Sequence, residues 1–304
     1  MGLFKKKNHK LEPVTCPEEN YLVWKWRPAK KKSKAEVTAG TKIVVAENAT
    51  AVVVYQNEMG TYLDFITGPR DEVLSAENLP IISNIMGEGF RDGAVLPVVI
   101  YYINLSRTMQ TGFSVPSFMV SDPSAPEIEV PVAVKGLMSY RVADAAEFVK
   151  RHRLDEVTEE ALTEQVITAT AKYVRAAVLS APSVDHLPVV EFERRIDEIN
   201  SLVEIPVRER LAEELGVKVT SVDIEMIDID EESEGYKRLA GIASANANVA
   251  EEMYYVAVKG KPVGPYRADT IKKLVATGTI TADSLVWHRG MNGWTKIADV
   301  AELK

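Results

Sequence analysis

The spacing of the apolar residues changes near residue 142, and this change limits the folds open to the chain. Before it, apolar and polar residues alternate with a period of two, as in the run from Ile128 to Lys135. After it, residues such as Leu162, Val166, Ala169 and Tyr173 recur every three or four positions. These two periods are those of strands and helices. The sequence therefore predicts an α+β fold, with a mainly antiparallel β region over residues 20–142 followed by helices.

Several local signals refine this prediction. Residues 79–82 are expected to form a short strand, and Pro131 marks an edge strand or a bulge because proline cannot donate to a sheet. Thr158 is expected to cap a long helix. A second helical stretch is expected over residues 189–216, with a kink or a new helix at Pro206. A β-bulge is expected at Thr220 and Ser221, where the alternation slips by one residue.

The last fifty residues form a separate pattern of strand, turn, short helix and strand. Residues 254–258 and 283–287 read as strands, and residues 268–276 read as an amphipathic helix. The sequence therefore divides into four parts: a flexible segment over 1–20, a large domain over 21–230, a helical connector over 231–252, and a small α+β module over 253–304.

Charge and cysteine usage exclude some classes of protein. The net charge of −8 argues against nucleic-acid binding. A single cysteine, Cys16, permits neither an intrachain disulfide nor a thiolate zinc site, which fits a reducing, cytoplasmic compartment. The longest apolar run, about residues 94–105, is roughly half of the ~20 residues that a membrane helix needs. Any membrane contact is therefore expected to be peripheral.

The N-terminal 34 residues are basic, with ten Lys and Arg against three Glu. One interpretation is attraction to anionic lipid head groups at the inner face of a membrane. The other is a solubilising tail and a charged loop, and the sequence leaves both open. The candidate lipid-contacting residues are Lys5, Lys6, Lys7, Lys30, Lys31 and Lys32.

No motif with bond-making chemistry is present. The chain has no phosphate-binding glycine-lysine loop and no His-Glu-x-x-His pair, and its four histidines are scattered. We therefore expect no catalytic residue, no metal site and no cofactor. An enzyme whose residues converge only in space stays a further hypothesis, and a deep pocket with several perturbed titratable groups would favour it.

The order of segments resembles the SPFH family (stomatin, prohibitin and flotillin, also called Band 7), and within it a bacterial subgroup described as virion-core-protein-like. The matching segments are Met1-Gly-Leu-Phe4, Trp24-Lys-Trp-Arg-Pro28, residues 39–47, residues 51–55, Gly68, Leu79-Pro80, residues 134–140 and residues 216–224. The resemblance implies an α+β domain that forms homo-oligomers and organises membrane patches or partner proteins without catalysis.

Residues 253–303 resemble a GYF-like module, through Tyr254-Tyr255, Gly264-Pro-Tyr266, Leu274, residues 278–280, residues 285–287 and Gly293-Trp294. GYF domains bind proline-rich peptides on an aromatic surface, so the resemblance makes Tyr255, Tyr266, Trp287 and Trp294 the candidate partner-binding residues. The defining Gly-Tyr-Phe is replaced here by Gly278-Thr279-Ile280. The alternative is that these aromatic residues form the core of the module: the apolar strand around Trp287 favours the core, whereas Tyr266 and Trp294, beside turn residues, fit either place.

These observations favour a non-enzymatic scaffold that self-assembles and recruits an unidentified protein or peptide through its C-terminal module. The alternative is a monomeric cytosolic adaptor in a stress pathway, which keeps the binding module and has no role at a membrane.

Overall fold

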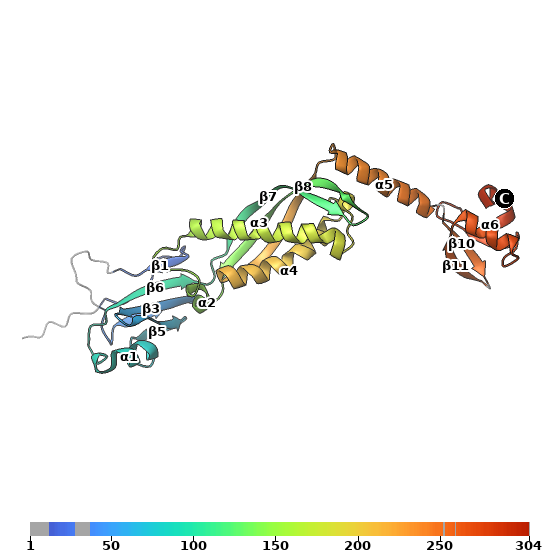
Figure 1. Ribbon diagram of the computed structural model, residues 1–304. Coiled ribbons are helices and arrows are strands. Elements are labelled where there is room, and N and C mark those ends of the chain that lie inside the picture. Colours follow the sequence, from blue (N-terminus) through green and yellow to red (C-terminus); the bar gives the residue numbers. More distant parts are fainter. Residues whose placement is uncertain (1–11, 28–36, 252, 259, 304) are drawn as a thin grey trace, which may run out of the picture. The chain divides into compact units, whose positions relative to one another are not determined.

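A computed structural model describes residues 12–27, 37–251, 253–258 and 260–303 of the chain (Figure 1). It divides into two compact units, of which the first comprises Met1–Val120 with Val132–Ile229, and the second Ser121–Pro131 with Asp230–Lys304. Sheets are mostly antiparallel and the helices follow in the second half of the large domain, so the predicted α+β class is confirmed.

The first unit begins with a β layer. Its strands are β1 (Val23–Lys25), β2 (Lys42–Val45), β3 (Ala49–Asn57), β4 (Gly60–Thr67), β5 (Arg70–Val73) and β6 (Val98–Asn104). Four of them form an antiparallel sheet in the order β1-β6-β3-β4, and β2 pairs with β5. One apolar cluster fills this layer, and Tyr102 at its centre is 1% exposed.

A short helix, α1 (Pro80–Met86), packs against β4, and the 3-10 turn η1 (Gly87–Gly89) follows it. The strand predicted over residues 79–82 is therefore wrong. Pro80 occupies the first helical turn, where a missing N–H costs nothing. The buried carboxylate of Asp64 accepts hydrogen bonds from the backbone N–H groups of Ile81 (3.1 Å) and Ile82 (2.8 Å), which fixes the start of the helix.

A second layer consists of a three-stranded sheet and the helices that cover it (Figure 1). The sheet has the order β7-β8-β9, and the strands and helices are β7 (Met109–Asp122), β8 (Ala125–Val142), α2 (Ala145–Val149), α3 (Glu159–Val184), η2 (Val189–Glu191), α4 (Ile196–Leu215) and β9 (Val217–Ile229). Buried and exposed residues alternate along the strands, so one face of the sheet is buried. The Tyr140 and Thr163 hydroxyls lie 2.7 Å apart and tie α3 to β8.

Local signals set the start of α3 and an irregularity in β9. Thr158 caps α3 as predicted, because its hydroxyl accepts from the Ala161 amide at 3.2 Å. In the β8–β9 pairing, Ser139 lies opposite Ser221 and Tyr140 lies opposite Val219, so Thr220 is left without a partner. This confirms the predicted bulge. The second helix is shorter than predicted: it begins at Ile196 after a 3-10 turn and runs through Pro206 without starting a new helix.

The second unit contains α5 (Glu234–Glu251) and a small α/β module. The elements of the module are β10 (Tyr254–Val258), β11 (Lys261–Tyr266), α6 (Ala268–Ala276), β12 (Leu285–Trp287), β13 (Thr295–Lys296), η3 (Ile297–Asp299) and η4 (Ala301–Leu303). The strands form one antiparallel sheet in the order β11-β10-β12-β13.

Candidate peptide-binding surface

One face of the sheet in the C-terminal module carries its core. Tyr254 and Val256 on β10 and Val286 on β12 are each at most 3% exposed. They pack with Ile271 of α6 and with apolar residues of the two terminal 3-10 turns. Because successive side chains on a strand point to opposite faces, the intervening residues of β10 and β12 lie on the other side of the sheet.

That other side, which we call the open face, carries a pair of aromatic rings. Tyr255 on β10 lies opposite Trp287 on β12 in the register, and their ring centroids are 6.2 Å apart at an angle of 41°. Both side chains are half-buried, and Leu285, two positions before Trp287, is 40% exposed. Pro262 on β11, opposite Ala257, extends the same face. The open face therefore carries two aromatic rings beside the apolar side chains of Leu285 and Pro262.

The other two predicted aromatic residues have different places. Tyr266 lies opposite Tyr254 and packs against the core cluster, so it belongs to the core side of the sheet. Trp294 is 42% exposed. Residue Thr295 pairs with Val286, and the same register continued by one residue sets Trp294 opposite Trp287 on the open face. Tyr255 and Trp287 are thus paired on one face, and the continued register adds Trp294 beside them.

Residue spacing could have identified further members of this surface. Leu285 and Trp287 are two positions apart in a predicted strand, so they share a face. Lys296 pairs with Leu285 in the sheet and therefore lies on the same side, where its ammonium group contacts the Asp283 carboxylate at 2.9 Å. Pro262 could not have been placed, because a register shift between Tyr254 and Val256 decides which residue of β11 lies opposite which residue of β10.

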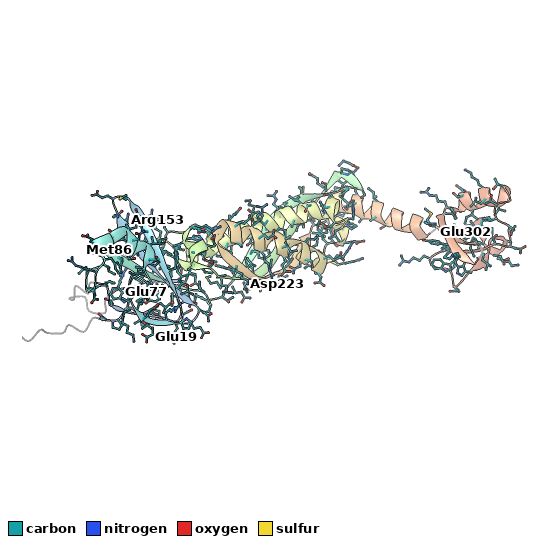
Figure 2. The ribbon with its side chains drawn as sticks, turned by 90° about the horizontal axis from the view of Figure 1, so that it is seen from below. Glu19, Glu77, Met86, Arg153, Asp223 and Glu302 are labelled. Carbon is teal, nitrogen blue, oxygen red and sulfur yellow. The ribbon has the colours of Figure 1, made fainter. Side chains whose placement is uncertain are left out.

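The module has the opposite charge to the rest of the folded chain. Residues 253–304 carry eight Lys and Arg against four Asp and Glu, whereas residues 35–252 carry 18 against 37. Exposed acids of the first unit include Glu19, Glu77 and Asp223 (Figure 2). An isolated basic module attracts acidic partners and is repelled by basic ones, over a distance set by the salt concentration.

The predicted lipid-contacting residues, Lys5, Lys6, Lys7, Lys30, Lys31 and Lys32, lie outside the described residues. Within the part of the chain that the structure describes, no helix combines the length and apolar character needed to cross a membrane.

A cavity of about 390 Å³ in the first unit contains the single cysteine. Burial raises the pKa of the Cys16 thiol, and burial likewise raises the pKa of the neighbouring Tyr21 and Tyr102 hydroxyls. All three shifts favour the neutral forms, whereas a nucleophilic cysteine needs a lowered pKa. The residues that line this cavity include no histidine that could act as a base. The arrangement favours packing over catalysis.

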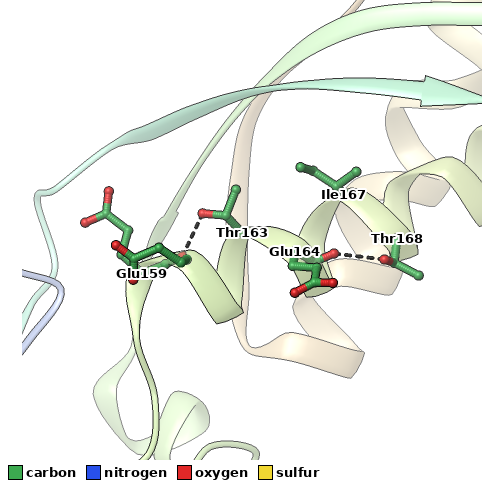
Figure 3. Close-up of a pocket in the computed structure, with 6 residues that line it drawn as sticks. Glu159, Thr163, Glu164, Ile167 and Thr168 are labelled. Carbon is green, nitrogen blue, oxygen red and sulfur yellow. Dashed lines mark hydrogen bonds between the residues drawn. The ribbon is translucent and has the colours of Figure 1, made fainter.

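A second hollow, of about 430 Å³, lies along the first turns of α3 (Figure 3). Its threonine hydroxyls are used within the helix: Thr163 donates to the Glu159 carbonyl at 2.7 Å and Thr168 to the Glu164 carbonyl at 2.9 Å. The Glu159 carboxylate pairs with Arg107 at 2.6 Å. Across the described residues, no group of three or more His, Cys, Asp or Glu side chains is arranged to hold a metal ion.

The fold thus defines a two-part protein, in which an α+β domain of strands and covering helices is followed by a small module with an exposed aromatic face. The SPFH domain-Band 7 family matches residues 23–241, and GYF domain 2 matches residues 254–303. The chain belongs to the SPFH domain-Band 7 family and ends in a GYF-type domain, which confirms both predicted resemblances. No curated protein matches the chain. Both domains fit a scaffold or protein-interaction role, and the family is generally not enzymatic.

Proposed function

We propose that this protein is a non-enzymatic scaffold that self-assembles through its SPFH domain and recruits a protein partner through the open face of its C-terminal module. The observation that carries the proposal is the pair formed by Tyr255 and Trp287 on the side of the sheet that faces away from the core. Burying these rings on a partner removes apolar area from water without disturbing the core of the module.

A proline-containing segment is the partner that this surface suits best. Polyproline forms an extended helix without internal hydrogen bonds, so it presents a preformed ridge and loses little entropy on binding. Aromatic grooves bind such ridges in several domain families, and GYF domains bind proline-rich peptides. The open face combines two half-buried rings with the exposed Trp294 and Leu285, which supports the same mode of binding.

Fluorescence anisotropy with the full chain and a labelled decaproline peptide tests this proposal. We expect saturable binding that Trp287→Ala weakens about tenfold, because one aromatic contact contributes on the order of 1 kcal/mol or more. Phe65→Ala is the matched control, since Phe65 is an exposed aromatic residue of β4 in the other unit. If Trp287→Ala binds the peptide as well as the wild type does, or if Phe65→Ala is weakened as much as Trp287→Ala, the open face is not the peptide site.

Self-assembly and membrane contact need their own tests. Light scattering on the eluted protein should give a mass of several chains, and a strict monomer over a wide concentration range would contradict the scaffold proposal. We further propose peripheral attachment to the inner face of a bacterial membrane. Vesicles with anionic lipid should then pellet the protein at low salt only. The triple charge reversal of Lys30, Lys31 and Lys32 to Glu should abolish pelleting, and pelleting that is indifferent to salt and to these charges would oppose attachment.

A further inference from the structure

The chain itself contains an exposed segment with the features of a ligand for its own C-terminal module. Strands β7 and β8 are joined by a turn, and residues 121–131 around it, which we call the hairpin tip, contain Pro123, Pro126 and Pro131. We propose that the module of one copy binds the hairpin tip of a second copy. This inference rests on the proposed peptide-binding function of the open face and names the partner.

The hairpin tip presents its prolines on a fixed backbone. The Asp122 carboxylate accepts from the Ser124 amide at 2.9 Å and from the Ser124 hydroxyl at 2.6 Å, which holds the turn. Pro123 and Pro126 are exposed, whereas Ala125 is 3% exposed. A residue that precedes proline is restricted to extended conformations, so the backbone at Asp122 and Ala125 has little freedom to lose on binding.

One edge of β8 lacks its β9 neighbour along the hairpin tip. The pairing of β8 with β9 begins at Val132, opposite Ile229. The chain after β9 continues along the end of the tip nearest to Val132, where the Asp230 amide donates to the Pro131 carbonyl at 3.1 Å and Gly235 lies against Glu129. Pro126, five residues before Pro131, is exposed and lacks the N–H group that a neighbouring strand would need. The exposed prolines therefore lie on a segment that a second molecule can approach.

The charges of the two surfaces are complementary. Residues 121–131 contain three acids and no Lys or Arg, while the module carries four more basic than acidic residues. Glu127 and Glu129 are exposed, and neither forms a salt bridge within the described part of the chain. Lys296 lies on the open face of the module, where it pairs with Asp283 at 2.9 Å, so the complementarity depends on the net charge of the whole module. Opposite charges steer the two surfaces together and disfavour basic competitors.

Helix α5 separates the hairpin tip from the module along the chain. A Cβ atom on Gly235 would lie 1.9 Å from the Glu129 carbonyl oxygen, so the first turn of α5 contacts the hairpin tip directly. The helix has 18 residues, and at ~1.5 Å per residue its far end, before β10, is roughly 27 Å away. A second copy is therefore the favoured occupant. Such a head-to-tail contact joins two different surfaces and produces rings or open chains.

The test uses the full chain and a fluorescein-labelled peptide of residues 119–132. We expect saturable binding by anisotropy, at least tenfold weaker for the Pro123→Ala/Pro126→Ala peptide and weaker again at high salt. The Trp294→Ala and Leu285→Ala chains should each bind the peptide several-fold more weakly. Both side chains are exposed, so these variants should fold, and Phe65→Ala should bind like the wild type.

The contact between copies is tested separately. The full-length Pro123→Ala/Pro126→Ala chain should have a lower average mass than the wild type by light scattering at equal concentration. An equal mass, or a wild type that binds the peptide but stays monomeric, would overturn binding to a second copy. Binding of decaproline without binding of the 119–132 peptide would overturn this inference and leave the proposed function standing. Failure to bind either peptide would remove both.

Discussion

The buried carboxylate of Asp64 should be the main determinant of helix α1, and the substitution Asp64→Ala tests this. Asp64 is 3% exposed and accepts the Ile81 and Ile82 amides at 3.1 and 2.8 Å. The residue that precedes the helix, Leu79, has no side-chain hydrogen bond to its first turn. Asp64 on β4 therefore accepts the N–H groups of the first helical turn, which in most helices bond to a capping residue next to the helix in the sequence.

The size of the effect follows from the number of hydrogen bonds. A hydrogen bond to a charged group contributes about 1.5–3 kcal/mol, and loss of a helix cap costs up to about 2 kcal/mol. The Ile82 side chain is buried while that of Ile81 is 48% exposed, so water can replace only part of the loss. We expect Asp64→Ala to destabilise α1 by about 2–3 kcal/mol.

Hydrogen exchange measures this directly. A loss of about 2–3 kcal/mol corresponds to exchange of the Ile81 and Ile82 amides that is roughly 30- to 150-fold faster. Asp71→Ala is the matched control, because Asp71 lies on β5 in an exposed ion pair with Lys42 and such pairs contribute little. Unchanged exchange of both amides in Asp64→Ala, or equal acceleration in the control, would refute the assignment of this carboxylate as the cap.

Three further predictions concern other parts of the chain. Gly235→Ala places a Cβ atom 1.9 Å from the Glu129 carbonyl oxygen, so we expect faster proteolysis within α5 and a loss of about 1–3 kcal/mol; wild-type resistance would contradict this contact. The Tyr102 hydroxyl donates to the Val14 and Val44 carbonyl oxygens, each at 3.0 Å, and burial raises its pKa. Its contribution to stability is therefore present below about pH 10 and lost above it as the unfolded state ionises, so Tyr102→Phe should flatten the fall in stability between pH 9 and 11. Because burial raises the pKa of Cys16, iodoacetamide at pH 8 should alkylate it more slowly than a free peptide thiol, and an equal rate would count against burial of the thiol.

Much of the fold could be predicted because its signals are local. Period-two alternation and the turn residues located β3, β6, β8 and β10, and Thr158 located the start of α3. Such signals depend on which side chains face the core. Core-facing side chains recur at every second residue of a strand and at every third or fourth residue of a helix. The bulge beside Ser221 was visible for the same reason, since an extra residue reverses the alternation.

The candidate site was predicted only in part. The sequence singled out four aromatic residues, favoured the core for Trp287 and left core and surface open for Tyr266 and Trp294. The structure assigns Tyr266 to the core side and sets Tyr255 opposite Trp287, and these places depend on strand register and on an irregularity in β10. The hairpin tip and the module are more than 120 residues apart in the sequence, so only the fold indicates that both are exposed.

By itself, the sequence determined the fold class, the family resemblance and the presence of a distinct C-terminal module, because composition and apolar periodicity are properties of neighbouring residues. Only the tertiary structure decided that residues 80–86 form a helix rather than a strand, since the carboxylate that starts this helix comes from a strand 16 residues earlier. Only the tertiary structure decided which aromatic rings face away from the core. Both outcomes depend on pairing between strands, and the energy of such a pairing is not contained in either strand alone.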